Sequence, residues 1–304
     1  MDEPSSEAKR TAVGPPSVLA YLDPNYWNDR FTCEDHYEWL KDYSHFRHLI
    51  QQHITPTSSV LELGCGNSQL CDELYKEGIT KLTCIDLSSV AVQKMQTRLL
   101  SKGYKGLCIS IISSWIQLFD NYIESAYVVF TTGEQTHLGF LTSKLRTSDL
   151  QNIKVLEGDM LDLSFADESF DVVIEKGTMD VLFVDSGDPW NPRPEAVNRA
   201  MTMLQGVHRV LKPNGIFISI AFGQPHFRRP LFSAPEFTWS IEYATFGDGF
   251  HYFFYILRKG QRSSSEVDAD VKKVETPSLC LYQDELDDED YLFRTNIDEM
   301  GDDR

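Results

Sequence analysis

The 304-residue chain lacks several features that would place it in particular protein classes. The longest apolar stretch, GLCISIISSWIQLF, is shorter than 18 residues and is interrupted by serines and a glutamine, so no membrane-spanning helix is expected. The opening MDEPSSEAKR lacks the charged-then-apolar pattern of a secretory signal. The six cysteines form no C-x-x-C pair and no zinc spacing. These absences favour a reduced, cytoplasmic protein without a metal site.

Positive charge is also scarce. The chain has 28 Lys and Arg against 46 Asp and Glu, a net charge of −18, which argues against nucleic acid as the main partner. Residues 261–304 contain 5 basic and 14 acidic residues (5 − 14 = −9), half of the total charge. We expect this segment to be a disordered acidic tail, either solubilising or a docking segment. Residues 1–20, polar and proline-bearing, are expected to be a flexible N-terminus, and the protein is expected to be a monomer.

Between these ends, strand-like and helix-like segments alternate over residues 21–260. Asp23 and Pro24 indicate the start of a helix, and a second helix is expected at about 42–53. Continuous apolar strands separated by helices indicate a parallel sheet covered on both faces. Two aromatic segments joined by Gly-Asp-Gly then indicate an antiparallel hairpin. The expected fold is therefore a doubly wound, mostly parallel, seven-stranded Rossmann-like α/β sheet that ends in a C-terminal antiparallel hairpin. The expected strands before the hairpin are 59–63, 81–85, 153–157, 171–175 and 216–221, and the helices between them are about 67–77, 88–101 and 195–211.

An atypical stretch at about 106–151 interrupts this alternation. Some fifty residues stand where an αβ loop needs only a few, and residues 106–148 have half the charge density of the whole chain. Joining Lys105 to Asn152 would give SKGYKNIKVLEGDM, an ordinary helix–turn–strand passage. We interpret the stretch either as a true insertion or as non-coding message translated by mistake, placed at the outer edge of the sheet and opposite the ligand side.

The segment VLELGCGNSQL places a glycine turn between the first expected strand and the next helix. Gly64 and Gly66 let the backbone approach a ligand, and in a parallel sheet this turn lies where nucleotide-like ligands bind. Asp86 ends the second strand, where its carboxylate can accept hydrogen bonds from both hydroxyls of a ribose. Gln69 stands where a dinucleotide fingerprint needs Gly or Ala, which disfavours a NAD-dependent dehydrogenase. Glu62 suits a cationic ligand better than two phosphates.

S-adenosylmethionine meets these requirements, because it has a ribose, a cationic sulfonium and no phosphate. VLELGCGNS, CIDLSS, GDMLDLSFADESFDVVIEKGTMD and HRVLKPNGIFISI resemble, in order and spacing, the motifs of class I S-adenosylmethionine-dependent methyltransferases. YWNDRF, YEWL, EKGTMD, DPW, PHFR and YATFGDGFHYFFY resemble the methyltransferase-like 13 group, and within it the lysine methyltransferases of elongation factor 1-alpha. The resemblance spans about 20–260 without the atypical stretch. It implies a protein-lysine N-methyltransferase that uses S-adenosylmethionine and acts on elongation factor 1-alpha.

The resemblance also implies which residues bind the cofactor. Gly64 and Gly66 would line its amino-acid end, and Lys176 would contact the carboxylate side. Asp86 would hold the ribose, with Leu87 packed beside it. Removing the Asp86 carboxylate is expected to weaken cofactor binding and to leave the stability of the apo protein nearly unchanged.

The remaining implied contacts lie around the adenine and the sulfonium. Asp159 would accept a hydrogen bond from the adenine amino group, and Met160 would cover the ring. Trp27, Phe31 and Trp39 would fold over the cofactor, since aromatic faces attract a sulfonium; ordinary core packing is the alternative for these three.

The residues leave the general base and the substrate class open. Glu175, Asp180, His226 and Tyr243 are candidates for a base by position, and each can equally be structural. The segment PHFRRP is expected to form the rim of the substrate site. A small-molecule methyltransferase and a non-catalytic interaction module are the alternative functions. Against the first, only about fifteen residues separate the fifth strand from the hairpin, too few for a large helical lid.

Overall fold

The structure, a computed structural model, describes residues 15, 17–103, 128–132, 135–139 and 153–262. Residues 263–304 of the acidic tail and most of the stretch 106–151 therefore lie outside the described residues. None of the described helices is long and apolar enough to cross a bilayer.

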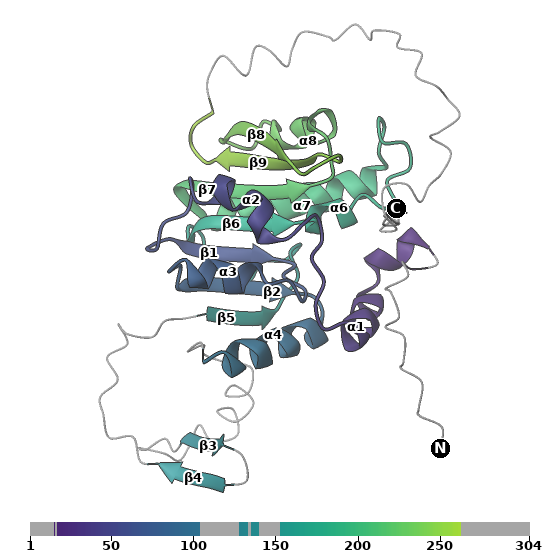
Figure 1. The fold of residues 1–304 in the computed structure, drawn as a ribbon. Coiled ribbons are helices and arrows are strands. Elements are labelled where there is room, and N and C mark those ends of the chain that lie inside the picture. The colour runs from purple at the N-terminus through teal and green to yellow at the C-terminus, as the bar shows by residue number, and fades with distance from the viewer. Residues whose placement is uncertain (1–14, 16, 104–127, 133–134, 140–152, 263–304) are drawn as a thin grey trace, which may run out of the picture.

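A seven-stranded sheet with the order β5-β2-β1-β6-β7-β9-β8 forms the centre of the molecule (Figure 1). The first five of these strands run parallel, whereas β9 is antiparallel to both β7 and β8. This arrangement confirms the expected doubly wound sheet and its terminal hairpin. The strands are β1 (Ser59–Leu63), β2 (Lys81–Asp86), β5 (Ile153–Glu157), β6 (Phe170–Lys176), β7 (Leu211–Ala221), β8 (Ser240–Phe246) and β9 (Tyr252–Arg258).

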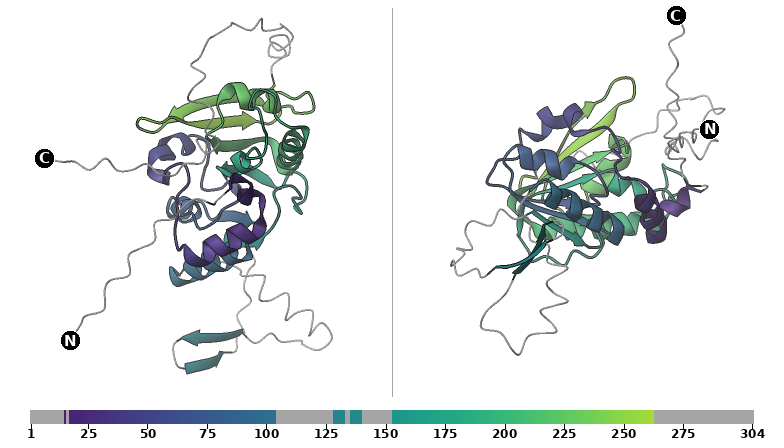
Figure 2. Two further views of the ribbon diagram at one scale, coloured as in Figure 1. Left: turned by 90° about the vertical axis from the view of Figure 1, so that its right-hand side faces the viewer. Right: turned by 60° about the horizontal axis from the view of Figure 1, so that its bottom comes forward.

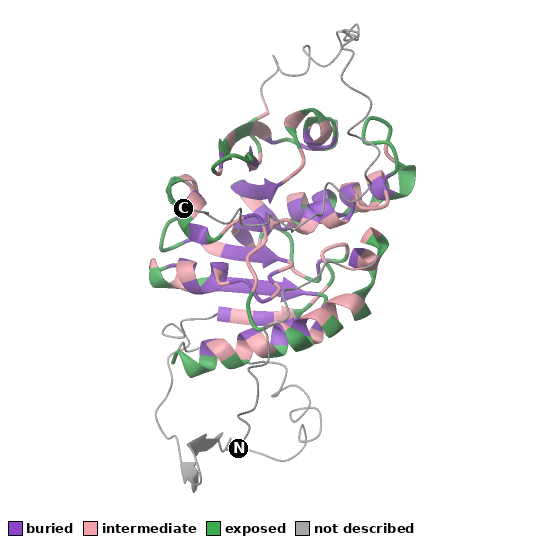
Figure 3. Cartoon of the chain, turned by 45° about the vertical axis from the view of Figure 1, so that its right-hand side comes forward, coloured by how far each residue is buried: buried purple, intermediate pink, exposed green. Residues whose placement is uncertain are grey.

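Helices cover both faces of the sheet, so the strands are buried in the middle layer (Figure 3). Strand alternation divides the core: Val60 packs on one face and Leu61 on the other. The first face packs against α2 (Tyr43–Ile50), α3 (Leu70–Lys76) and α4 (Ser89–Ser101). The second face packs against α6 (Thr178–Val181), α7 (Pro194–Val210) and α8 (Pro225–Phe232).

The chain before α2 forms a separate layer beside the sheet. It contains the 3-10 helix η1 (Val18–Leu22) and α1 (Pro24–Cys33), which packs against α4 (Figure 2). Asp23 caps α1 as expected, because its Oδ1 accepts a hydrogen bond from the Asn25 N–H at 2.9 Å. Helix η1 begins inside the segment expected to be flexible, and its Tyr21 is buried.

Several elements differ from the expected ones; α2, for example, ends at Ile50 rather than near residue 53, and β7 begins at Leu211 rather than at residue 216. Helix α3 begins at Leu70 rather than at residue 67, since Gly66 and Asn67 form a turn. The segment PHFRRP, expected to form the rim of the substrate site and given no secondary structure, forms α8 with Pro225 in its first turn. Strands β3 (Val128–Thr132) and β4 (Gln135–Gly139), within the atypical stretch, pair as a separate two-stranded sheet.

The atypical stretch joins the sheet at its outer edge. It lies between the end of α4 and the start of β5, and β5 is an edge strand. Its attachment to β5 is at Ile153, the amino end of that strand, whereas the carboxyl end leads into Gly158 on the opposite side. The described elements on either side therefore agree with an attachment at the outer edge of the sheet.

Candidate functional site

A cavity of about 470 Å³ lies at the carboxyl ends of β1, β2, β5 and β6, within the usual range for small-molecule sites. Parallel strands bring their carboxyl ends to one edge of the sheet, so residues far apart in sequence meet there. The cavity is lined by all ten residues that the sequence assigns to cofactor binding: Trp27, Phe31, Trp39, Gly64, Gly66, Asp86, Leu87, Asp159, Met160 and Lys176.

The glycine turn after β1 is crowded on two sides. Gly64 and Gly66 have φ values of +62° and +50°, in the left-handed region that favours glycine. A Cβ on Gly64 would lie 2.4 Å from the Thr178 Oγ1, and a Cβ on Gly66 would lie 3.2 Å from the Phe31 Cζ. The turn therefore needs glycine at 64 both for its backbone conformation and for the close approach of the chain after β6.

Asp86 holds the glycine turn against the start of α4. Its Oδ2 accepts a hydrogen bond from the Gly66 N–H at 2.7 Å, and its Oδ1 accepts one from the Ser88 N–H at 2.8 Å. Burial raises the pKa of Asp86, although these two hydrogen bonds counteract the shift. Because each carboxylate oxygen can accept more than one hydrogen bond, Asp86 can also bind a ligand in the cavity.

Glu62 brings a buried carboxyl group to the cavity. Strand alternation directs it to the same face as Val60, and its register partner on β2 is Cys84. The side chain is buried, and its Oε2 has no hydrogen-bond partner within the described part of the chain. Burial raises the pKa of Glu62 to about 7. A buried acceptor without a partner is costly, which is explained if a bound ligand supplies the donor.

Five aromatic residues that precede α2 also line the cavity: Tyr21, Trp27, Phe31, Tyr37 and Trp39. Trp27 and Phe31 stack with their ring centroids 5.6 Å apart. The guanidinium carbon of Arg30 lies 4.9 Å from the ring centroids of both Tyr37 and Trp39. The cluster thus already holds one cation against its rings, and its aromatic faces suit a second one in the cavity.

The residues after β5 line another part of the cavity. Asp159 Oδ1 accepts a hydrogen bond from the Leu161 N–H at 2.8 Å, which fixes the turn and leaves the second oxygen for a ligand. Met160 lines the cavity beside Asp159. Leu87 also lines the cavity, and its apolar side chain is 45% exposed to solvent.

The lining carries more negative than positive charge. Its acids are Glu62, Asp86, Asp159 and Asp180, whereas its bases are Lys176 and Arg199. This balance favours a cationic ligand over a phosphorylated one.

Comparison with known proteins shows which family this chain belongs to. The model of a methyltransferase domain family matches residues 137–238. The EEF1A lysine methyltransferase 4 of Mus musculus is 32% identical over 295 residues, which cover 93% of this chain and 96% of that protein. The protein of the same name from Bos taurus is 32% identical over 287 residues, covering 91% and 93%. This chain belongs to the EEF1A lysine methyltransferase family.

Two further proteins are more distant. The eEF1A lysine and N-terminal methyltransferase of Mus musculus is 25% identical over 70% of this chain and 23% of its own length. A solved SAM-dependent methyltransferase from Aquifex aeolicus is 14% identical, with a TM-score of 0.39 over 81% of this chain and 94% of that one. Family membership confirms the expected methyltransferase class and S-adenosylmethionine as the cofactor.

The residues of the cavity fit this cofactor. The unpartnered Glu62 oxygen is an acceptor of the kind that an ammonium group needs, and the aromatic cluster offers faces to a sulfonium. The acidic balance of the lining suits a ligand with net positive charge and no phosphate.

Of the four candidate bases, only Asp180 lines the cavity. Asp180 forms an ion pair with Arg228 and accepts a hydrogen bond from the Phe222 N–H at 2.8 Å. Glu175 is buried and accepts hydrogen bonds from the Thr178 and Met179 N–H groups at 2.9 and 3.0 Å, and burial raises its pKa to about 7. Its contacts fix the turn after β6, which is a structural role.

The other two candidates lie away from the cavity lining. His226, on α8, stacks on Trp190 with the ring centroids 4.9 Å apart, and Tyr243 is half-exposed on β8. The structure thus brings no histidine or tyrosine base from this group to the cavity.

The spacing of cysteines along the sequence did not reveal one group of possible metal ligands in the folded chain. Glu62, Cys71 and Cys84 are all buried, and their ligand atoms lie within 4.8 Å of one another. They come from β1, α3 and β2, so no short sequence motif links them. The same Glu62 also reaches the cofactor cavity.

Two polar residues that hold the glycine turn were also missed. Arg98, on α4, donates to the Asn67 carbonyl at 2.9 Å and pairs with the buried Asp72 at 2.9 Å. Glu38 accepts a hydrogen bond from the Gln69 N–H at 2.6 Å. Both lie about thirty residues from their partners in the sequence, so nothing in the local pattern marks them.

Proposed function

We propose that this chain transfers the methyl group of S-adenosylmethionine to a lysine of translation elongation factor 1-alpha in the cytoplasm. The observation that carries the proposal is the match, over nearly their whole length, to relatives named EEF1A lysine methyltransferase 4. The acidic cavity with its aromatic cluster supports it independently, because it suits a cationic cofactor and a cationic target.

In this proposal the cofactor's amino-acid end lies at the glycine turn. Gly64 and Gly66 allow close approach, Glu62 accepts a hydrogen bond from the amino group, and Lys176 attracts the carboxylate. All four residues line the cavity. Asp86 accepts from the ribose hydroxyls with the lone pairs that its backbone hydrogen bonds leave free.

The opposite end of the cavity would take the adenine. Asp159 would accept from the exocyclic amino group with its free oxygen, while Met160 and Leu87 would cover the apolar surface of the nucleoside. Trp27, Phe31 and Trp39 would face the sulfonium, a contact worth about 0.5–2 kcal/mol.

S-adenosylmethionine supplies an electrophilic methyl group bonded to a sulfonium. The residues of this chain then have to hold an uncharged lysine amine in line with that bond, within about 3–3.5 Å of the carbon. Asp180 and Phe222 line the cavity next to each other, since the Asp180 carboxylate accepts from the Phe222 N–H. We propose that the target lysine enters at this point, where an acidic group can receive its ammonium form before the proton is lost to solvent.

The substrate rim is proposed on α8 and the loop before α7. Trp190 is 76% exposed, yet its ring is held in place by His226 and by Phe227, whose centroid is 5.1 Å away. Arg228 of the same helix pairs with Asp180 at the cavity. An ordered, exposed tryptophan beside the lysine entrance is a typical anchor for a protein partner.

The test is methylation of purified elongation factor 1-alpha with isotopically labelled S-adenosylmethionine, followed by digestion and mass spectrometry. We expect label on one or more lysines of the factor and none when Gly64→Ala replaces the unmutated chain. Label that appears only in a small-molecule extract would instead favour the small-molecule methyltransferase. Cofactor binding without any transfer would favour the non-catalytic module.

A further inference from the structure

The residues before α2 form one connected unit, here called the N-terminal strap and defined as residues 17–42. Its aromatic side chains pack on one another, and Arg30 lies at their centre. Besides its contacts with Tyr37 and Trp39, Arg30 binds Glu34 through two nitrogens at 3.1 and 3.3 Å. The strap therefore contributes its rings to the cavity as a preassembled cluster.

The α1 end of the strap is attached to α4. The Ser88 hydroxyl donates to the Asn28 Oδ1 at 2.7 Å, and the Lys94 ammonium contacts the Asp35 carboxylate at 3.0 Å. Asn28 lies in α1 and Asp35 two residues beyond its end, so both attachments precede Tyr37 and Trp39 in the chain. The segment that carries Tyr37 and Trp39 needs a further attachment to stay over the cavity.

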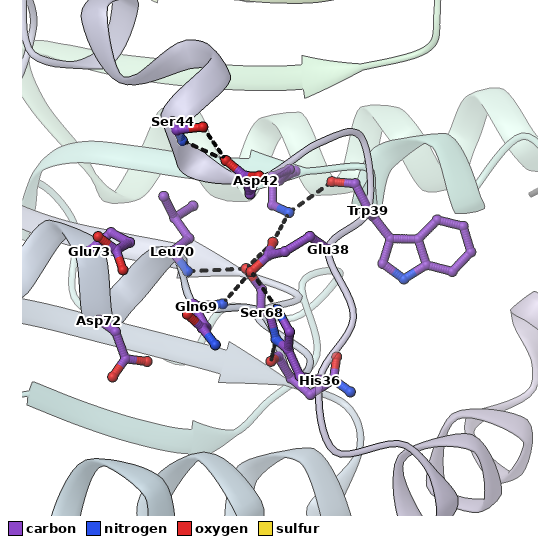
Figure 4. A network of polar contacts seen from close by, with 12 residues as sticks. His36, Glu38, Trp39, Asp42, Ser44, Ser68, Gln69, Leu70, Asp72 and Glu73 are labelled. Atoms are coloured by element: carbon purple, nitrogen blue, oxygen red, sulfur yellow. Dashed lines mark hydrogen bonds and ion pairs between the residues drawn. The ribbon is translucent and has the colours of Figure 1, made fainter. Parts of the chain in front are cut away.

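Glu38 makes that second attachment, as Figure 4 shows. Its Oε1 accepts from the Gln69 N–H at 2.6 Å, and its Oε2 accepts from the Ser68 hydroxyl at 2.9 Å. The same Oε2 pairs with the Lys176 ammonium at 2.6 Å. One carboxylate thus joins the strap both to the glycine turn and to the end of β6.

Glu38 acts at the cavity without lining it. Its two neighbours in the chain, Tyr37 and Trp39, do line it, as do Ser68 and Lys176 on the other side of the contact. Lys176 also donates to the Trp39 carbonyl at 2.8 Å, so the ion pair fixes the backbone of the tryptophan itself. Lys176 is 5% exposed and Glu38 14%, so solvent screens their interaction little.

We propose that Glu38 is a positioning residue that closes the N-terminal strap over the cofactor and thereby sets cofactor affinity. The inference rests on the proposed function, since it takes the occupant of the cavity to be S-adenosylmethionine. A carboxylate is required because it can accept from the turn and form the ion pair with Lys176 at the same time. Glutamine could keep the hydrogen bond from Gln69 but not the ion pair.

Calorimetry with S-adenosylmethionine, S-adenosylhomocysteine and the variants Glu38→Ala and Glu38→Gln tests this inference. For Glu38→Ala we expect affinity to fall about 10- to 100-fold, the loss typical of removing a charge-assisted hydrogen-bond acceptor. For Glu38→Gln we expect a smaller loss, about 3- to 10-fold. At saturating cofactor, kcat on elongation factor 1-alpha should stay within about twofold, so that the change appears in the KM for the cofactor.

A matched control variant and a direct measurement on the strap distinguish loss of strap positioning from a general loss of folded structure in Glu38→Ala. Glu73→Gln removes a carboxylate on α3 that pairs only with the exposed Lys76 among its described contacts, and should bind the cofactor normally. Hydrogen exchange in the cofactor-free protein should speed up over residues 17–42 in Glu38→Ala and not in the control.

Three results would overturn the inference: unchanged cofactor affinity in Glu38→Ala, unchanged exchange over the strap, or a fall in kcat with an unchanged KM. Failure of the proposed function looks different, because the unmutated chain would then bind no S-adenosylmethionine or label no lysine. Should Glu38→Ala not fold, Glu38→Gln carries the same test with the smaller expected loss.

Discussion

At the scale of single residues, Asp86 combines two tasks that the sequence does not separate. The pattern around it predicts a ribose contact, and a variant was therefore expected to affect binding alone. The structure shows that the carboxylate also accepts from the N–H groups of Gly66 and Ser88. A buried N–H without a partner costs about 1–3 kcal/mol. These two contacts therefore lead us to predict a loss of stability in the variant as well.

Asp86→Ala should accordingly weaken S-adenosylmethionine binding about 10- to 150-fold and also lower the melting temperature of the apo protein. Calorimetry and thermal unfolding of the same samples measure the two effects. Asp86→Asn keeps one acceptor and should recover part of the stability but less of the affinity. Unaltered binding in both variants would rule out the ribose role.

Glu62 gives the second residue-scale prediction, which concerns pH. Its folded pKa of about 7 lies above the ordinary value of 4.5. Between these values the folded apo protein holds a proton that the unfolded chain releases, so its stability should fall as pH rises from about 4.5 to 7. Glu175 shifts in the same direction and adds to this trend. Urea unfolding of the apo protein across this range should show a shallower decline in Glu62→Gln.

The same group makes cofactor affinity depend on pH. A cationic amino group favours the ionised carboxylate, so affinity should rise as pH increases from about 5.5 to 7, by up to about tenfold per unit. Calorimetry in buffers of different ionisation enthalpy should detect proton release on binding. A steep pH dependence that persists in Glu62→Gln would show that another group is responsible.

At the scale of elements, the parallel sheet and the glycine turn could be predicted because apolar runs, glycines and strand ends are local signals. The expected β1 and β5 coincide with the observed strands. Helix α8 could not be predicted, because a segment with prolines at 225 and 230 resembles a loop. Glu38 and Arg98 could not either, because their roles arise from contacts across about 30 to 138 residues.

Helix α8 leads to a prediction about the substrate. Trp190→Ala should raise the KM for elongation factor 1-alpha about 5- to 30-fold, since truncating an interface anchor typically costs 1–2 kcal/mol. Cofactor affinity should not change, because Trp190 does not line the cavity. Steady-state kinetics with the protein substrate measure the first effect and calorimetry the second.

A suitable control for Trp190→Ala is Leu100→Ala. Leu100 is also exposed, at 55%, but it lies near the end of α4 that faces away from the cavity. Its variant should keep the unmutated KM. If both variants behave alike, α8 does not form the substrate rim.

At the scale of the whole molecule, the cavity lies at the carboxyl ends of the strands, whereas the atypical stretch is attached to β5 at Ile153, the amino end of that strand. Joining Lys105 to Asn152, which deletes 106–151, should therefore preserve S-adenosylmethionine affinity and raise soluble yield. The join shortens a connection at an edge strand, and loop-closure free energy changes by only about 0.6 kcal/mol per doubling of length. The affinity of the deletion protein, measured beside the full chain, checks this.

The origin of the stretch is tested separately by sequencing transcripts, most of which should lack residues 106–151 if it is translated non-coding message. Transcripts that uniformly encode it would favour a true insertion. A deletion protein that fails to fold or to bind the cofactor would show that the stretch belongs to the domain.

The strap also has a consequence for how the protein is made. Glu38 and Lys176 are 138 residues apart, so Glu38 leaves the ribosome long before its partner exists. At about 5–20 residues per second, the interval is roughly 7 to 30 s. Until β6 is made, the tyrosines and tryptophans of the strap can pack only against one another and against elements already synthesised, such as α4. The nascent chain thus exposes an incompletely buried aromatic segment near the tunnel exit. Early binding of a chaperone to this segment would protect it until β6 is synthesised.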